Sequence, residues 1–252
     1  MKVSLVIPVY NEAGHLAEFL SQVDALAFDG LEKELVIVDD CSKDESASIL
    51  RGYNFKSSVQ LHFKTVNEGK GAAIRTGVGL ATGDIIGVQD ADFEYSMEDL
   101  PSILAPIVAG KADVVFGSRF KANVAQVHRT FHYLVNRFLT TLSNLCSGLY
   151  LTDMETCYKF FKADIIKNIK LESSRFGFEP EITAKIAGLK LKIIEVPIWY
   201  FPRNYLEGKK ITWKDGLAAL GHIFVFNFLR QPPSYLLPEL PKHYIPKGRQ
   251  WL

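Results

Sequence analysis

The sequence has no long apolar run, and this absence excludes the commonest kind of membrane protein. The longest candidates span residues 217–220 and 223–229 and are interrupted by Gly221 and His222, whereas a transmembrane helix needs about 20 consecutive apolar residues. The first five residues enter an apolar, strand-like segment directly and lack the shape of a signal peptide. We therefore expect a cytoplasmic protein without a membrane-spanning helix.

Cysteine is scarce, and charge of neither sign dominates. The three cysteines, Cys41, Cys146 and Cys157, are far apart and form no CxxC pair, which argues against a disulfide framework and against a zinc site. The formal net charge is only +1, so the composition indicates no nucleic-acid partner. A chain of 252 residues, 48% of them hydrophobic, is long enough for one well-buried α/β domain with additions.

What the first half does contain is a regular alternation of two kinds of segment. Segments rich in Val and Ile predict strands at residues 2–9, 34–39, 59–65, 85–89 and 113–116. Amphipathic or small-residue segments between them predict helices at residues 12–26, 44–50, 71–81 and 98–108. This alternation predicts an α/β fold with a mostly parallel, Rossmann-like sheet and helices on both faces. Ligands bind such sheets at the carboxyl ends of the strands.

The second half shows a different pattern. Residues 192–200 predict another strand, and residues 129–145 predict a helix whose apolar stripe consists of Phe131, Leu134, Val135, Phe138, Leu142 and Leu145. Prolines recur from Gln231 onward, so we expect an extended or partly disordered tail there. We expect residues 1–216 to form the main domain, with halves 1–120 and 121–216, and residues 217–252 to add an apolar helix and the proline-rich tail.

A pair of carboxylates follows the fourth predicted strand. Asp90 and Asp92 are separated by one residue, and alternate residues of an extended segment point the same way. Two such carboxylates, together with substrate phosphates, suit a hard divalent cation. Glu94 comes two residues later and is a further candidate ligand. The alternative is a solvated turn that caps the helix beginning near residue 97.

A second acidic pair, Asp39 and Asp40, follows the second predicted strand. These side chains are well placed to accept hydrogen bonds from a base or a ribose. Helix capping is the competing explanation, but Ser42 or Asp44 is better placed to cap the next helix. Capping therefore leaves Asp39 and Asp40 unexplained.

Two further segments follow strands. In Pro8-Val9-Tyr10-Asn11-Glu12, Tyr10 is able to flank a flat base. In Asn67-Glu68-Gly69-Lys70-Gly71, the glycines would let a ligand approach the backbone, and Lys70 offers positive charge to a phosphate. The second segment lacks the P-loop pattern, and no glycine fingerprint of a dinucleotide site follows a strand.

Together, these motifs resemble family-2 glycosyltransferases of the GT-A fold. The order Val6–Glu12, Val38–Asp44, Asn67–Gly71 and Asp90–Asp92 is similar to that of the polyprenyl-phosphate branch, which includes dolichol-phosphate mannosyltransferases and bactoprenol-phosphate glucosyltransferases. The resemblance covers about residues 1–216. It implies a GT-A fold, with interfacial helices toward the C-terminus.

The resemblance also implies roles for individual residues. Those expected around the nucleotide sugar are Pro8, Tyr10, Glu12, Asp39, Asp40, Lys70, Asp90 and Lys209. Those expected at Mg²⁺ or Mn²⁺ are Asp90, Asp92 and Glu94. Those expected in catalysis are Asp92, Arg119, Asp153 and Arg203. Arg119 is expected near the diphosphate. The loop with Arg203, Lys209 and Lys210 resembles a basic flap that closes over the phosphates. Those expected at the acceptor phosphate are Arg129, His132, Asn136 and Arg137. Close dolichol-phosphate mannosyltransferases carry an Arg at the position of His132 and Ser-Arg at the positions of Asn136-Arg137.

The implied reaction is inverting transfer of a hexose from a nucleotide diphosphate, of GDP-mannose or UDP-glucose type, to a polyprenyl or dolichyl phosphate. The implied partners are a membrane surface, with peripheral attachment at its cytoplasmic face, or a separate membrane subunit. One alternative is a hydroxyl acceptor, which needs Asp153 or Glu155 as base. The others are a nucleotidyltransferase, whose glycine-rich loop after the first strand is missing, and a nucleotide-sugar-binding module without transfer.

Overall fold

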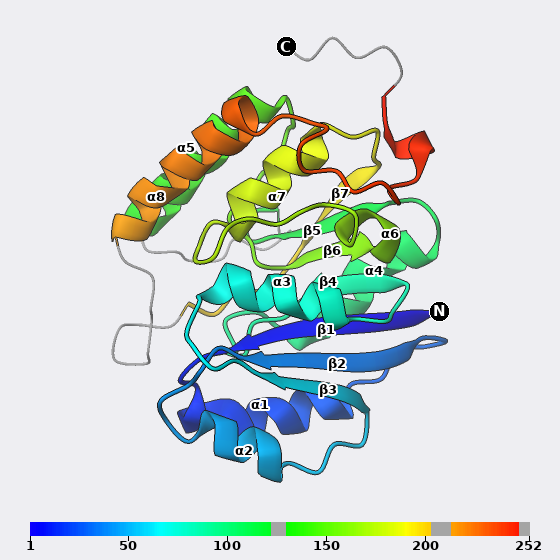
Figure 1. Ribbon diagram of the computed structural model, residues 1–252, viewed down its shortest axis with the longest axis vertical. Coiled ribbons are helices and arrows are strands. Elements are labelled where there is room, and N and C mark those ends of the chain that lie inside the picture. The colour runs from blue at the N-terminus through cyan, green and yellow to red at the C-terminus, as the bar shows by residue number, and fades with distance from the viewer. Residues whose placement is uncertain (122–129, 203–212, 247–252) are drawn as a thin grey trace.

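A seven-stranded sheet organises the chain (Figure 1). The computed structural model describes residues 1–121, 130–202 and 213–246. The strand order is β3-β2-β1-β4-β6-β5-β7. The strands are β1 (Lys2–Val9), β2 (Glu32–Asp39), β3 (Ser58–Phe63), β4 (Ile85–Val88), β5 (Val114–Ser118), β6 (Lys159–Lys162) and β7 (Ile193–Pro197).

The sheet is mostly parallel, as the alternation of segments predicts. β1 pairs in parallel with β2 and with β4, and β2 pairs in parallel with β3. The exception is β6, which the sequence analysis did not predict and which runs antiparallel between β4 and β5. The carboxyl ends of β1, β2, β4 and β5 therefore meet at one edge, where the candidate residues cluster.

Helices cover the sheet and fix its strands. α1 (Ala13–Ala25), α2 (Ser46–Gly52) and α3 (Lys70–Leu80) follow β1, β2 and β3, and η1 (Met97–Asp99) leads into α4 (Leu100–Val108). α3 packs on β1 and β2, whereas α4 packs on β5 and β6. The approach of α3 is close, because a Cβ atom on Gly77 would lie 2.4 Å from the Val6 side chain. The apolar residues of α1 and of the central strands form the buried core.

Two long helices lie side by side at one end of the molecule (Figure 1). They are α5 (Thr130–Ser147) and α8 (Trp213–Phe224), and α8 continues into the π-helical turn η3 (Val225–Leu229). α7 (Phe178–Ala187) contacts both, while α6 (Ala163–Ile166) follows β6. Within the described residues, no helix combines the length and the hydropathy that crossing a bilayer requires.

The proline-rich tail is irregular, as expected, but it packs on the domain. The backbone N–H of Lys170 donates to Tyr235 O at 2.8 Å, and that of Lys190 donates to Tyr244 O at 2.8 Å, beside the short helix η4 (Lys242–Tyr244). Tyr235 and Tyr244 are buried in the main core. The boundary expected at residue 216 falls inside α8, whose Ile223 also belongs to that core.

Candidate active site

The carboxyl edge of the sheet contains strained backbone. Asn11, Cys41 and Phe93 have φ angles of 52°, 59° and 56°, values that residues other than glycine rarely adopt. They are the non-glycine residues with positive φ in the described part of the chain, and they lie in the loops after β1, β2 and β4. Such conformations persist only where surrounding contacts fix them, and they cluster at functional sites.

Hydrogen bonds join the loops after β1 and β2 into one unit. The backbone N–H of Asn11 donates to Ser42 Oγ at 3.0 Å, and the backbone N–H of Lys43 donates to Asn11 Oδ1 at 2.7 Å. The backbone N–H of Glu12 donates to Ser46 Oγ at 2.9 Å. The two loops that carry the expected nucleoside-binding residues are therefore held in a fixed relation.

The resemblance implies that Pro8, Tyr10 and Glu12 surround the nucleoside, and in the structure they lie at this edge of the sheet. Pro8 and Tyr10 are half-buried, and Glu12 is buried. His15 was missed by the sequence analysis: its Nε2 lies 3.0 Å from Glu12 Oε2 and 3.0 Å from Ala91 O, inside the carboxylate motif. His15 therefore connects the start of α1 to the loop after β4. These segments are far apart in the sequence, so no local pattern predicts the contact.

The two adjacent acids after β2 have different roles. Asp39 accepts a hydrogen bond from the Ser42 N–H at 3.1 Å through Oδ2, whereas its Oδ1 is buried without a partner. Asp40 uses both oxygens within the protein, accepting from the N–H groups of Glu68 and Gly69 at 3.1 and 2.6 Å. An orphaned buried acceptor is costly, so Asp39 is suited to a ligand donor, while Asp40 holds the loop after β3.

The glycines of that loop approach the protein's own backbone. A Cβ atom on Gly69, whose φ is +95°, would lie 2.4 Å from Ser174 O. The N–H of Gly71 donates to Arg175 O at 3.0 Å, and the N–H of Ala72 donates to Ser174 O at 3.1 Å. The expectation that these glycines open the backbone to a ligand is therefore not supported, because residues 173–175 occupy that space.

Lys70 lies within an acidic cluster. Its Nζ is 2.8 Å from Asp90 Oδ2 and 3.7 Å from Glu179 Oε1, and Glu179 is in the first turn of α7. Burial disfavours the ammonium charge, but Asp90, Cys157 and Glu179 together outweigh this effect, and the pKa of Lys70 is well above its ordinary value. Lys70 therefore stays positively charged and forms ion pairs with Asp90 and Glu179. Glu179 was missed by the sequence analysis because its neighbours are distant in the chain.

The other two carboxylates of the motif contact different partners. Asp92 Oδ1 accepts from the Glu94 N–H at 3.1 Å, and Glu94 Oε2 accepts from the Tyr200 hydroxyl at 3.2 Å. Burial and the Glu94 charge hold the pKa of Tyr200 well above its ordinary value, so Tyr200 stays a hydrogen-bond donor. In the described ranges, no three His, Cys, Asp or Glu side chains converge as a closed metal site.

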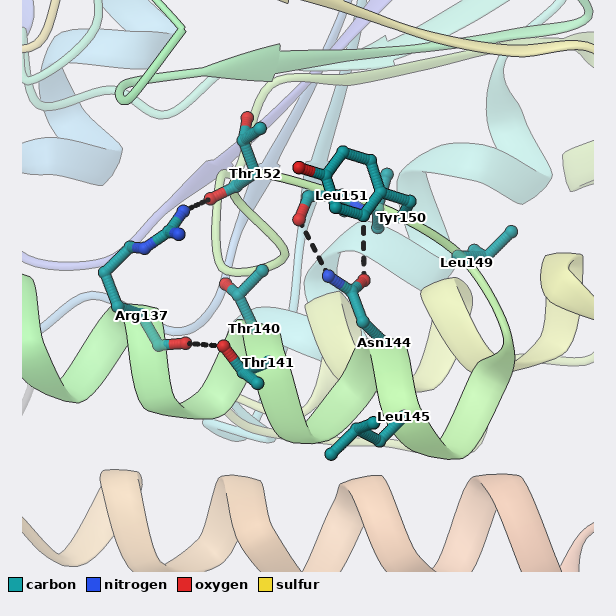
Figure 2. Close-up of a pocket in the computed structure, with 9 residues that line it drawn as sticks. All are labelled: Arg137, Thr140, Thr141, Asn144, Leu145, Leu149, Tyr150, Leu151 and Thr152. Atoms are coloured by element: carbon teal, nitrogen blue, oxygen red, sulfur yellow. Dashed lines mark hydrogen bonds between the residues drawn. The ribbon is translucent and has the colours of Figure 1, made fainter.

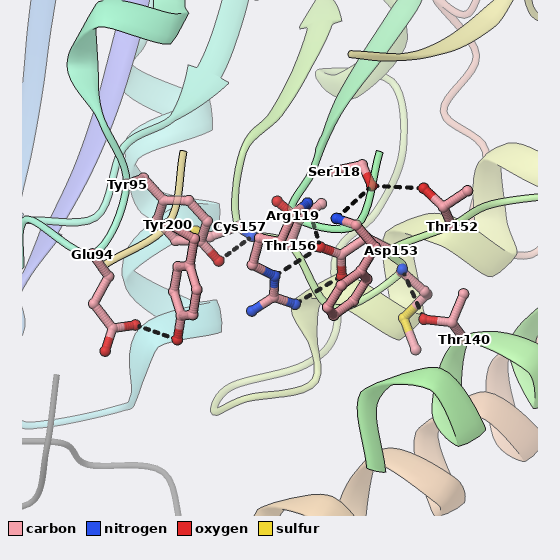
Figure 3. Close-up of polar contacts among 12 residues, drawn as sticks. Glu94, Tyr95, Ser118, Arg119, Thr140, Thr152, Asp153, Thr156, Cys157 and Tyr200 are labelled. Atoms are coloured by element: carbon pink, nitrogen blue, oxygen red, sulfur yellow. Dashed lines mark hydrogen bonds and ion pairs between the residues drawn. The ribbon is translucent and has the colours of Figure 1, made fainter. Parts of the chain in front are cut away.

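A buried ion pair connects the end of β5 to the loop before β6 (Figure 3). Arg119 Nε donates to Asp153 Oδ2 and Nη2 donates to Oδ1, both at 2.7 Å, and the Arg119 N–H adds a third bond at 3.0 Å. Burial alone would raise the pKa of Asp153, but Arg119 outweighs burial and lowers it. Asp153 is therefore committed to positioning Arg119, which argues against its expected role as a base.

The loop that carries Asp153 is fixed from several sides. Glu195 of β7 accepts hydrogen bonds from the N–H groups of Thr152 and Asp153 at 2.9 and 3.1 Å. At its other end, the Cys157 N–H donates to the Tyr95 hydroxyl at 3.2 Å (Figure 3). Glu195 was also missed by the sequence analysis, because its role depends on the pairing of β7 with β5.

The same loop carries Glu155, whose carboxyl group has one buried oxygen without a hydrogen-bond partner. Its Oε1 is buried and has no hydrogen-bond partner, and the same is true of Oγ1 of its neighbour Thr156. Burial first, and then the negative charge of Glu179, raise the pKa of Glu155 to about 7. The structure therefore favours Glu155 over Asp153 as a proton-accepting group at neutral pH.

The expected acceptor residues of α5 lie beside this loop. His132 and Asn136 are half-buried. Arg137 is exposed, and its Nη1 donates to Thr152 O at 3.3 Å (Figure 2). It borders a cavity of about 360 Å³ lined by Arg137, Thr140, Thr141, Asn144, Leu145, Leu149, Tyr150, Leu151 and Thr152. Arg129, Arg203, Lys209 and Lys210 lie outside the described residues.

The apolar stripe of α5 is divided between core and surface. Val135 and Leu142 pack against the core, whereas the remaining stripe residues are exposed: Phe131 by 72%, Leu134 by 58%, Phe138 by 60% and Leu145 by 79%. The neighbouring helix and π-turn expose Leu217, Phe224, Phe228 and Leu229. The stripe thus has one side in the protein and one side toward solvent.

Comparison with known proteins agrees with this architecture. Residues 4–170 match the model of glycosyl transferase family 2. The chain is 29% identical to a dolichol-phosphate mannosyltransferase of Pyrococcus furiosus, covering 89% of this chain and 63% of that protein. It is 32% identical to an undecaprenyl-phosphate mannosyltransferase of Micrococcus luteus, covering 83% of this chain and 87% of that protein. The chain thus spans less than two thirds of the Pyrococcus relative.

A solved structure shares the fold. Glucosyl-3-phosphoglycerate synthase from Mycobacterium tuberculosis, in complex with Mn²⁺, UDP-glucose and phosphoglyceric acid, superposes with a TM-score of 0.64. The alignment covers 90% of this chain and 79% of that one at 16% sequence identity, so it bears on the fold alone. With the family match over residues 4–170, the sheet order and the edge described above, the chain belongs to glycosyl transferase family 2 and has the GT-A fold.

Proposed function

We propose that this protein is an inverting glycosyltransferase that moves a hexose from a nucleotide diphosphate to a polyprenyl phosphate at a membrane surface. The observation that carries the proposal is the position of α5. This helix exposes large apolar side chains and also places Arg137 against the loop that holds Arg119 and Asp153. The names of the Pyrococcus and Micrococcus relatives support the same class of acceptor.

The nucleotide part of the donor is assigned to the loops after β1 and β2. The orphaned Oδ1 of Asp39 accepts a hydrogen bond from the base or the ribose. Pro8, Tyr10 and Glu12 flank it from the first loop. Arg119, held in a fork by Asp153, faces the diphosphate and stabilises the charge that develops there on departure.

A divalent cation, Mg²⁺ or Mn²⁺, fits the residues after β4 as an open site. The candidate ligand atoms are carboxylate oxygens, which such cations prefer. Asp90 also forms an ion pair with Lys70, and Glu94 also accepts a hydrogen bond from Tyr200. Asp92, with help from Asp90, would hold the ion, while phosphate and water oxygens complete its coordination. Such an ion neutralises charge on a departing diphosphate. We expect Asp92→Asn to abolish the metal dependence of nucleotide-diphosphate binding in calorimetry.

A phosphate acceptor suits the groups near α5. A phosphate monoester has a second pKa near 6, so it is mostly dianionic at neutral pH and needs little help from a base. The commitment of Asp153 to Arg119 is compatible with that chemistry. Arg137, with Asn136 and His132 nearby on the same helix, provides positive and polar groups for the phosphate.

The membrane surface is assigned to the exposed faces of α5 and α8. An 18-residue helix is about 27 Å long and, with one apolar and one polar side, lies in the interface plane. Attachment is then peripheral, at the cytoplasmic face, either by this surface alone or together with a separate membrane subunit. Leu134 and Phe138 would enter the lipid, while Val135 stays in the protein core.

A hydroxyl acceptor is the second candidate, and Glu155 is the observation that favours it. Its raised pKa, about 7, suits a general base. The test is a comparison of undecaprenyl phosphate with undecaprenol as acceptors, using UDP-glucose and GDP-mannose with Mn²⁺. We expect organic-extractable hexosyl lipid with the phosphate only. Product with the alcohol, or only with water-soluble hydroxyl acceptors, would favour the second candidate.

A further inference from the structure

Residues 153–157 connect two groups of the proposed donor site. At one end, Asp153 binds Arg119 through three hydrogen bonds. At the other end, Cys157 is buried next to Asp90 and Lys70: burial first, and then the Asp90 carboxylate, raise the pKa of its thiol. Glu155 is midway along this segment in the sequence, and the charges of Arg119, Asp153 and Glu179 all act on its carboxyl group.

The surroundings of Glu155 provide charges of both signs but no hydrogen bond to its buried Oε1. Glu179 and Asp153 contribute negative charge, and Lys159 and Arg119 contribute positive charge. Lys159 is committed elsewhere, since its Nζ donates to Met154 O and Thr156 O, each at 2.8 Å. A carboxyl group retained only for folding would be paired, because burying an unpaired acceptor is costly.

The chemistry of the missing partner follows from this position. In the proposed site, Arg119 binds the diphosphate, and a cation held by Asp92 with help from Asp90 binds it too, so the attached sugar ring would lie next to the segment that connects Arg119 and Asp90. Sugar hydroxyls are neutral donors, and a buried carboxylate oxygen without a donor is the complementary group. We propose that Glu155 is a sugar-recognition residue that accepts a hydrogen bond from a hydroxyl of the donor hexose. This inference rests on the proposed function and assigns recognition of the donor sugar to a particular residue.

The test compares binding of nucleotide sugars with binding of the matching nucleotide diphosphates. Calorimetry with Mn²⁺ would measure Kd for UDP, UDP-glucose, GDP and GDP-mannose with wild-type protein, Glu155→Ala and Glu155→Gln. We expect Glu155→Ala to weaken the preferred nucleotide sugar about tenfold or more, the size of a hydrogen bond to a charged group. Binding of the diphosphate should change less than about twofold. Glu155→Gln keeps a neutral acceptor and should recover part of the loss.

Controls separate recognition from a structural effect. Glu18→Gln makes the same chemical change on the exposed face of α1 and should alter neither Kd. Deoxy analogues of the preferred sugar should identify one hydroxyl whose removal weakens wild type but not Glu155→Ala. Equal weakening of sugar and diphosphate, or no weakening of either, would overturn the inference. Absence of any nucleotide binding by wild type would instead overturn the proposed function on which the inference rests.

Discussion

Asp153 and Arg119 illustrate how a residue's role depends on its partner. Both are buried, and each satisfies the other through a two-pronged contact. A buried pair of this kind contributes little net stability, but removing one partner leaves an uncompensated charge. In the proposed function Arg119 binds the diphosphate, and its orientation then depends on the ionised Asp153 carboxylate beside it.

Replacement of Asp153 tests this positioning role. We expect Asp153→Asn to lower the free energy of unfolding by about 3–5 kcal/mol and to reduce transfer activity strongly, because Arg119 loses its fixed orientation. Urea unfolding and turnover would be measured together. Asp164→Asn, the same change at an exposed position of α6, is the matched control. A general-base role for Asp153 would instead predict lost activity with unchanged stability.

Glu155 should make stability depend on pH. Its pKa is raised from 4.5 to about 7 in the folded state, with burial as the main cause, so the folded protein holds this proton more tightly than the unfolded chain. The associated stability is fully present below pH 4.5 and is lost as pH rises toward 7. The shift corresponds to about 3 kcal/mol at most.

Glu155→Gln mimics the protonated carboxyl group and tests that dependence. We expect the variant to match wild type in urea unfolding at pH 4.5 and to be more stable at pH 8. Comparison of the two proteins at each pH cancels the titration of all other groups. A stability difference that is the same at both pH values would show that Glu155 does not titrate in this window.

At the scale of elements, α5 has one side packed against the core and one side exposed. Leu139 is buried, whereas Phe131, Leu134 and Phe138 are exposed by more than half. A liposome flotation experiment with Phe131→Ser, Leu134→Ser and Phe138→Ser combined should give a folded protein that no longer floats. Each large apolar side chain contributes at most roughly 1.5–3 kcal/mol of burial in lipid.

A matched triple variant controls for lost surface hydrophobicity. Val66→Ser, Val108→Ser and Ile245→Ser change exposed apolar side chains elsewhere, and this protein should float like wild type. Unfolding of the α5 triple variant, shown by its circular dichroism, would mean that these side chains stabilise the domain. Flotation of a folded α5 variant would exclude α5 as the membrane contact.

The elements that sequence patterns predicted well are those governed by local periodicity. β1 has the expected limits, residues 2–9. α1 differs by one residue at each end, and β2 begins two residues earlier than predicted and ends as predicted. β6 was missed because Lys159 and Lys162 enclose its two apolar residues, so it shows no apolar run typical of a strand. α7 was missed because it buries charged residues. Lys185 pairs with Glu181 inside the protein, whereas a pattern of charged residues in a sequence predicts an exposed segment.

For the whole molecule, the sequence predicted the location of the candidate site at one edge of the sheet, but not the contacts between its side chains. Positions after strands identified Asp39, Asp90 and Asp92 because parallel strands bring their carboxyl ends together. The contacts of Asp153, Glu155 and the newly found residues depend on segments far apart in the chain. The Asp153–Arg119 contact, for example, joins the end of β5 to the loop before β6, so no local pattern contains it.

The most direct test of the central claim is a transfer reaction in liposomes that contain undecaprenyl phosphate. Purified protein, Mn²⁺ and a panel of UDP- and GDP-hexoses would be incubated, and lipid extracts analysed by mass spectrometry while released nucleotide is quantified. The account predicts a hexosyl lipid phosphate from at least one donor, formed in a one-to-one ratio with nucleoside diphosphate and abolished by chelator. Release of nucleoside diphosphate with free hexose, and no lipid product from any donor, would contradict it.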